Sequence, residues 1–131
     1  MDKKILKTFL RPNGHGSLYE IDLVHCNGEY FLTDNGETYK KLDAIFEMKE
    51  PDVIKNLVAI LKSSGARRIA KTNEFVIILG DWVEELLKEE PEESTQSKDE
   101  SLSEKKEYLF QSLYRLLYCI YFMEKMTIFY T

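Results

Sequence analysis

Residues 17–38, SLYEIDLVHCNGEYFLTDNGET, carry the strongest structural signals in this 131-residue chain. In the segment YEIDL, apolar side chains alternate with acidic ones, which is the period of a half-buried strand. Asn27 and Gly28 follow, and they favour a two-residue turn because a type I′ turn needs positive φ at both central residues. A second apolar run begins after this turn. The stretch therefore predicts a β-hairpin over residues 17–33.

The chain leaves this hairpin through a turn that predicts a helix over residues 36–48. Asp34 can act as the N-cap of this helix, and Glu37 three residues later would complete a capping box. We therefore assign Asp34, Gly36 and Glu37 a structural role as turn and cap. A metal site using Asp34, Glu37 and Asp43 is the alternative, but an EF-hand loop needs more oxygen ligands at alternating positions.

The remaining apolar patterns predict a small antiparallel sheet with helices packed on it, an α+β fold. A second helix is predicted over residues 51–65, since proline suits its first turn and glycine its end. Short strands are predicted over residues 67–70 and 75–79, followed by a helix capped by Asp81. Residues 5–10 fit a helical turn, and a short strand is the alternative.

The net charge of −5 comes from one acidic segment. Residues 84–107 carry ten acidic and four basic side chains, whereas the residues before them are balanced. A basic face of the kind that neutralises nucleic-acid phosphates is therefore not expected. We expect an α+β domain over residues 1–88, an acidic linker or loop over residues 89–107 and a C-terminal helix over residues 108–131.

The C-terminal helix is expected to be apolar on almost all sides. Its longest uninterrupted apolar run, Leu116–Met123, is bounded by Arg115 and by Glu124 and Lys125. This run is too short for a membrane span, which needs about 20 apolar residues. A helix with two apolar faces needs two partners, so one face is expected to cover the domain and the other to meet a second chain.

The chain offers little for catalysis. It lacks the spacings of zinc sites, phosphate loops and hydrolase motifs. His25 and Cys26 are adjacent, but neighbouring residues of a strand point to opposite faces. We therefore expect no enzyme activity, no cofactor and no metal; an enzyme using Cys26 or the pair Asp34 and Glu37 is the alternative. With no visible apolar leader and too few cysteines for a disulfide framework, a cytoplasmic location is expected.

The element YFLTDNGET, residues 30–38, followed by Leu42, resembles an uncharacterised prokaryotic and phage-associated domain family. In that family a strand runs into a T-D-(D/N)-G-E-T turn and then into a helix. The resemblance covers residues 1–90, and this chain departs from it in its acidic segment and its aromatic last helix. The resemblance implies a phage or mobile-element setting in a bacterium, where small proteins of this type often bind a host protein.

The sequence thus predicts a small non-enzymatic protein-binding or inhibitor protein whose partner is a host protein or a second copy. The most specific form of this hypothesis is that the protein inhibits a bacterial defence nuclease. The acidic segment would then compete with nucleic acid for the basic groove of that nuclease. A homodimer through the C-terminal helix is expected. The residues predicted to make the interaction are Tyr114, Tyr118, Tyr121, Phe122, Glu89, Glu90, Glu92 and Glu93.

The alternative is a dimeric regulator associated with nucleic acid. The chain has one local basic cluster, and two-fold symmetry would double it. Its members are Lys62, Arg67, Arg68 and Lys71. A solvated loop explains the same residues, so this function ranks second.

Overall fold

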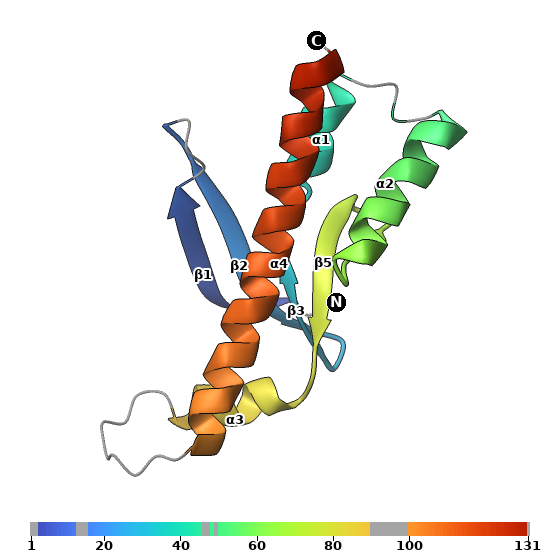
Figure 1. Ribbon diagram of the computed structural model, residues 1–131. Helices are drawn as coiled ribbons and strands as arrows, with labels where there is room; N and C mark the ends of the chain where they lie inside the picture. The colour runs from blue at the N-terminus through green and yellow to red at the C-terminus, as the bar shows by residue number, and fades with distance from the viewer. Residues whose placement is uncertain (1–2, 13–15, 46–47, 49, 90–99, 131) are drawn as a thin grey trace.

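The computed structural model describes residues 3–12, 16–45, 48, 50–89 and 100–130 (Figure 1). An antiparallel sheet of five strands is combined with helices, which confirms the α+β fold class. In chain order the elements are β1 (Lys4–Pro12), β2 (Leu18–Cys26), β3 (Glu29–Thr33), α1 (Glu37–Asp43), α2 (Pro51–Ser63), β4 (Arg67–Ile69), β5 (Glu74–Leu79), α3 (Trp82–Glu89) and α4 (Glu100–Tyr130).

The strand order in the sheet is β1-β2-β3-β5-β4. The predicted hairpin is present as β2 and β3, and Asn27 and Gly28 turn between them at φ 53° and 79°. β3 lies at the centre of the sheet because β5 pairs with its other edge, with Thr33 opposite Val76. The end of β3 therefore meets the beginning of β5, although the two are far apart in sequence.

Residues 4–12 form a strand. The helical turn predicted for residues 5–10 is therefore wrong, and the alternative prediction of a short strand is correct. β1 pairs with β2 from Lys4 to Pro12, with a register shift between Ile5 and Lys7. Phe9 is buried against the core, whereas Ile5 and Leu10 stay exposed. Pairing with β2 satisfies backbone N–H and C=O groups along this segment.

The helix after the hairpin is shorter than predicted, because α1 ends at Asp43 rather than near residue 48. The N–H groups of Ala44 and Ile45 donate to carbonyls three residues earlier, which tightens and closes the last turn. By contrast, α2 begins at Pro51 as predicted. Gly65 follows it at φ 77° and forms a Schellman-type end.

The C-terminal helix begins at Glu100 rather than at Tyr108, so part of the expected acidic linker is helical. The first turns of α4 lie along α3. Lys105 forms an ion pair with Glu85 of α3, and the ring of Tyr108 lies 6.1 Å from that of Trp82. These contacts to α3 explain why the helix extends N-terminally into a polar stretch.

A single hydrophobic core joins the sheet to all four helices, and α4 crosses one face of the sheet in this core (Figure 1). The C-terminal helix therefore packs on its own sheet. Burying each of its large apolar side chains contributes about 1.5–3 kcal/mol. The core residues of α4 along one stripe are Leu109, Leu113, Leu116, Ile120 and Met123.

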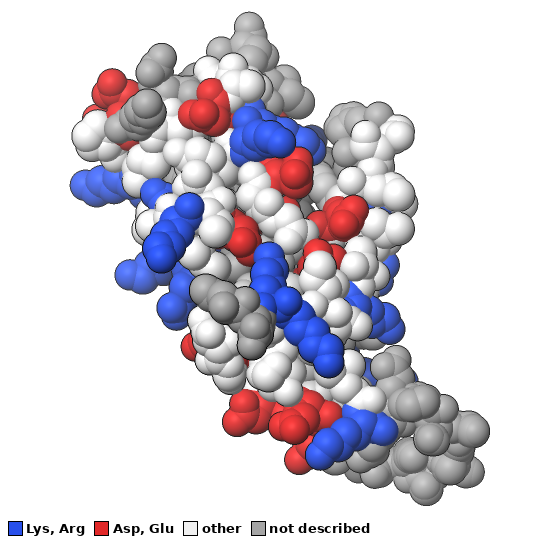
Figure 2. Space-filling model, turned by 180° about the vertical axis from the view of Figure 1, so that it is seen from behind, with Lys and Arg blue, Asp and Glu red and all other residues white. Residues whose placement is uncertain are grey.

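The opposite face of the sheet carries a smaller cluster of Val24, Phe31 and Val76. Figure 2 shows the molecule from this side, and Lys and Arg side chains are interspersed there with Asp and Glu. This face therefore has no large area of a single charge in the part of the chain that the structure describes.

Candidate protein-binding face

The outward side of α4 carries polar and aromatic residues in the spacing of a coiled-coil seam. Its residues follow one another at alternating steps of four and three, directly opposite the buried stripe. We call this set the outer seam. It consists of Glu107, Gln111, Tyr114, Tyr118, Tyr121 and Lys125.

Three tyrosines form the middle of the outer seam, and all three are exposed. The exposed fraction is 52% for Tyr114, 74% for Tyr118 and 38% for Tyr121. Phe122 beside them is 54% exposed. Exposed aromatic rings of this kind carry much apolar area, and aromatic residues are enriched at protein interfaces. The structure thus brings together the four aromatic residues predicted for the interaction.

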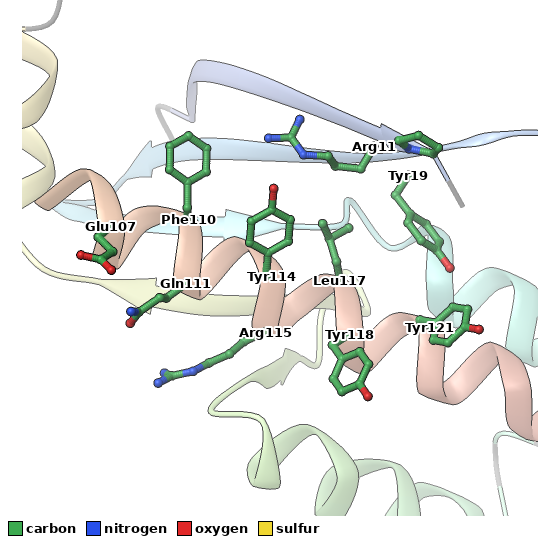
Figure 3. Close-up of a pocket in the computed structure, with 11 residues that line it drawn as sticks. Arg11, Tyr19, Glu107, Phe110, Gln111, Tyr114, Arg115, Leu117, Tyr118 and Tyr121 are labelled. Atoms are coloured by element: carbon green, nitrogen blue, oxygen red, sulfur yellow. The ribbon is translucent and has the colours of Figure 1, made fainter. Parts of the chain in front are cut away.

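An open groove runs between the outer seam and the edge of the sheet (Figure 3). Its volume is about 900 Å³. Arg11 and Pro12 of β1 and Tyr19 of β2 form one wall, and α4 forms the other. The guanidinium carbon of Arg11 lies 5.9 Å from the ring centre of Tyr114, so a cation–π contact spans the groove.

A second groove lies on the other side of the outer seam, between α2 and α4. It has a volume of about 520 Å³ and includes Ser63 and Ser64 of α2 and its end. Tyr118 and Tyr121 line both grooves. The outer seam is therefore a ridge with space on each side, which a partner could contact from both directions.

A polar cluster holds the C-terminal half of α4 in place. The phenol of Tyr19 donates to Glu124 Oε1 at 2.8 Å, and Lys41 Nζ lies 3.3 Å from Glu124 Oε2. Burial raises the pKa of Tyr19, and the neighbouring carboxylate of Glu124 raises it further. This cluster joins β2, α1 and α4 one turn beyond Tyr121, the last tyrosine of the outer seam.

Asp34 has a structural role, but it does not occupy the N-cap position predicted for it. Gly36 is the N-cap residue of α1, at φ 80°. Asp34 Oδ1 accepts hydrogen bonds from the N–H of Gly36 and of Phe75, both at 2.9 Å, and Oδ2 accepts from the N–H of Thr38 at 3.2 Å. Burial raises the pKa of Asp34, and these hydrogen bonds oppose that rise. The carboxylate therefore joins β5 to the first turn of α1.

The predicted capping box with Glu37 is not formed. Glu37 is the first residue of α1, and the N–H of Asp34 donates to the carbonyl of Phe75 at 3.2 Å. The box fails because β5 supplies the partner that the Glu37 side chain was expected to supply. Among the residues described, no group of three or more His, Cys, Asp or Glu side chains could hold a metal ion.

A wider polar network around the same turn was not anticipated from the sequence. Thr33 Oγ1 donates to Glu74 Oε1 at 2.6 Å, and Asn35 Nδ2 donates to Asp22 Oδ2 at 3.0 Å. Thr8 on β1 completes it by donating to Asp22 Oδ1 at 2.7 Å. The signal for this network in the sequence was the TDNGET motif, whose hydrogen bonds link β3 to β2 and β5 and, through Asp22, to β1.

The basic cluster is partly assembled. Lys62, Arg67 and Arg68 line a groove of about 580 Å³ at the junction of α2 and β4, whereas Lys71 lies in the following turn. The guanidinium of Arg68 lies 5.8 Å from the ring centre of Tyr39, and its buried Nε has no hydrogen-bond partner among the described residues.

His25 and Cys26 have separate surroundings. The ring of His25 stacks on that of Tyr30 at 4.4 Å, on the side of the sheet that holds the main core. Cys26 packs against the smaller cluster on the other side. The second cysteine, Cys119, is buried, and burial raises the pKa of its thiol.

The acidic interaction residues predicted from the sequence fall outside what can be described. Glu89 is the last residue of α3, but its side chain is not described. Glu90, Glu92 and Glu93 lie outside the described residues. The part of the chain with described structure contains no helix long and apolar enough to cross a membrane.

Comparisons with protein-family models, with curated proteins and with solved structures found no significant match to this chain. The resemblance carried by residues 30–38 therefore stays a prediction.

Proposed function

We propose that this protein is a small non-enzymatic binding protein that docks a partner protein on the outer seam of α4. The observation that supports this most directly is the exposure of Tyr114, Tyr118 and Tyr121 on a helix whose other side is fully buried. A helix that serves packing alone needs no aromatic residues on its solvent side.

The surroundings of the outer seam support the same function. The two grooves would let a partner bury both sides of the Tyr118 and Tyr121 rings and one side of the Tyr114 ring, and well-buried aromatic anchors make large contributions to binding. Arg11, Glu107 and Lys125 surround the aromatic centre with charge. An apolar centre with a polar rim is the usual anatomy of a protein interface.

Affinity capture from a nuclease-treated bacterial lysate tests the proposal. Tagged protein should retain one stoichiometric protein that mass spectrometry identifies, and Tyr114→Ala with Tyr118→Ala should reduce its retention about tenfold or more. Ile5→Ala is the matched control, since Ile5 is also exposed but lies on β1 away from both grooves. Equal retention by the tyrosine variant and the control would contradict the proposal.

In its narrower form, the proposal makes the partner a bacterial defence nuclease and the protein its inhibitor. The resemblance to a phage-associated family and the acidity of residues 84–107 support this form. Replacing Glu90, Glu92 and Glu93 by Gln should weaken inhibition of a captured nuclease, because a basic substrate groove would attract the segment less strongly. Unchanged inhibition would reject the role of the acidic segment while leaving the outer seam untouched.

A dimeric regulator associated with nucleic acid is the second candidate. The observation that favours it is the shared groove of Lys62, Arg67 and Arg68. A gel shift with duplex DNA at low salt should then be detectable and should disappear in an Arg67→Glu, Arg68→Glu variant. The absence of any shift at low salt would dispose of this candidate.

A further inference from the structure

The outer seam is complementary to a second copy of itself in antiparallel orientation. Glu107 lies at its N-terminal end and Lys125 at its C-terminal end, with the tyrosines between them. Both charged side chains are exposed. A two-fold axis through the level of Leu116 therefore places the acidic end of each helix against the basic end of the other.

The whole seam obeys this symmetry. The seam residues form pairs whose two members lie equally far before and after Leu116 in the sequence. In the two-fold arrangement, one member from each copy therefore meets the other member in the same layer. These alternating four- and three-residue steps also place the knobs of one helix over the holes of the other. The layers are Glu107 with Lys125, Gln111 with Tyr121, and Tyr114 with Tyr118, each formed twice.

We infer that two copies of this chain dimerise by antiparallel packing of their α4 helices along the outer seam. This inference rests on the proposed function, because it names a second copy of the chain as a partner of the same surface. Two Glu107–Lys125 pairs, one at each end, set the direction. A parallel arrangement would instead place Glu107 against Glu107 and Lys125 against Lys125, which is repulsive at both ends.

Two charged residues close to these pairs, Glu124 and Arg115, are directed toward other parts of their own chain. Glu124 is engaged by Tyr19 and Lys41 of its own chain, so Lys125 supplies the cationic charge at this end of the seam. Arg115 lies near the two-fold axis, but its guanidinium points toward Gly65 at the end of α2 rather than along the seam. Two Arg115 side chains can therefore stay apart in the dimer.

The rim of the seam adds aromatic contact. Helical spacing places Tyr108 and Phe122 on one flank of the outer seam, where Tyr108 lies near Trp82 of α3 and Phe122 lines the groove beside α2. They are 60% and 54% exposed. Antiparallel packing brings Tyr108 of one copy near Phe122 of the other on this side. Burying both rings twice would remove much of the apolar area that the single chain leaves in water.

Disulfide cross-linking tests the direction and the register. Gln111→Cys and Tyr121→Cys proteins, mixed and oxidised, should form a covalent heterodimer, because these positions share a layer. Each variant alone should cross-link weakly, and the parent protein, which contains Cys26 and Cys119, is the control. Homodimers from each variant alone would show parallel packing and would overturn the inference. The absence of cross-links in the mixture would also overturn it.

Charge reversal tests the end pairs without adding cysteines. Sedimentation equilibrium at low salt should show that Glu107→Lys and Lys125→Glu each weaken the dimer about tenfold, since each converts two attractive pairs into repulsive ones. The double variant should recover the affinity of the parent. Circular dichroism checks that every variant is folded, and no recovery in the double variant would overturn the inference.

The outcome separates this inference from the proposed function. A monomeric protein that still captures a different protein through Tyr114 and Tyr118 overturns the dimer and keeps the proposed function. A monomeric protein that captures nothing overturns both. A dimer with the predicted cross-link supports the inference, whatever else the lysate yields.

Discussion

The phenol of Tyr19 on β2 donates a hydrogen bond to the carboxylate of Glu124 on α4, with Tyr19 Oη and Glu124 Oε1 2.8 Å apart. This bond spans 105 positions of the sequence and joins the C-terminal helix to β2, the strand next to the edge of the sheet. Because Tyr19 also lines the groove beside the outer seam, the same side chain shapes the candidate surface and supports the fold.

Tyr19→Phe should lower the free energy of unfolding by about 1–2 kcal/mol, since Glu124 loses a donor in a partly buried position. The pKa of Tyr19 is raised in the folded protein by burial and by Glu124. The folded state therefore holds the phenol proton of Tyr19 more tightly than the unfolded state. The stability that this proton contributes is fully present below the ordinary tyrosine pKa of about 10 and declines as the pH rises above it. Denaturant unfolding from pH 7 to 11 should show a decline above pH 10 that is smaller in Tyr19→Phe.

Asp34→Asn should lower the free energy of unfolding by about 2 kcal/mol near neutral pH, because an amide nitrogen cannot accept a hydrogen bond from a backbone N–H. Asp43→Asn, on the exposed side of α1, is the matched control and should change little.

The pH dependence of the Asp34 variant tests the cause separately. Burial raises the pKa of Asp34, so the folded state favours the protonated carboxyl. This preference for the protonated form adds to the free energy of unfolding below the ordinary aspartate pKa of about 4. The contribution is lost as the pH rises through the pKa of Asp34 in the folded protein. The wild-type protein should therefore lose stability relative to Asp34→Asn as the pH rises above about 4. An unchanged difference as the pH rises would contradict this role of burial.

Gly36→Ala should destabilise the protein more than Gly28→Ala does. Both glycines have positive φ, 80° and 79°, so each substitution costs about 1–2 kcal/mol of backbone strain. A Cβ at position 36 would also meet the carbonyl oxygen of Thr72 at 3.1 Å, whereas a Cβ at position 28 meets nothing within 4 Å. Thermal unfolding of the two variants measures the difference, and equal melting temperatures would argue against a tight contact at Thr72.

Leu113→Ala and Tyr114→Ala separate the two faces of α4 with adjacent residues. Leu113 is fully buried, so its truncation should cost about 2–5 kcal/mol of unfolding free energy. Tyr114 is half exposed, and its truncation should cost less than about 0.5 kcal/mol while weakening partner capture. Urea denaturation and affinity capture, run on both variants, give the comparison. A large stability loss in Tyr114→Ala would mean that this ring serves the core.

Local patterns were sufficient wherever the physical cause is local. The Asn27-Gly28 turn needs positive φ at two successive residues, and this requirement is visible in the sequence. The start of α2 at Pro51 and its end at Gly65 follow in the same way from backbone preferences. The aromatic residues of the candidate surface were also found from helical periodicity, together with the expectation that one face of their helix looks away from the domain.

Other features depend on contacts between distant residues. Residues 5–10 are compatible with helix and strand, and pairing with β2 selects the strand. Asp34 was expected to accept hydrogen bonds from N–H groups of the helix that follows it. It also accepts a hydrogen bond from the N–H of Phe75 on β5, which no local pattern reveals. The alternating spacing along α4 defines a stripe of aliphatic residues and an opposite face of tyrosines and polar residues. Packing against the sheet buries the aliphatic stripe and leaves the outer seam in solvent, because the sheet covers only one face of the helix.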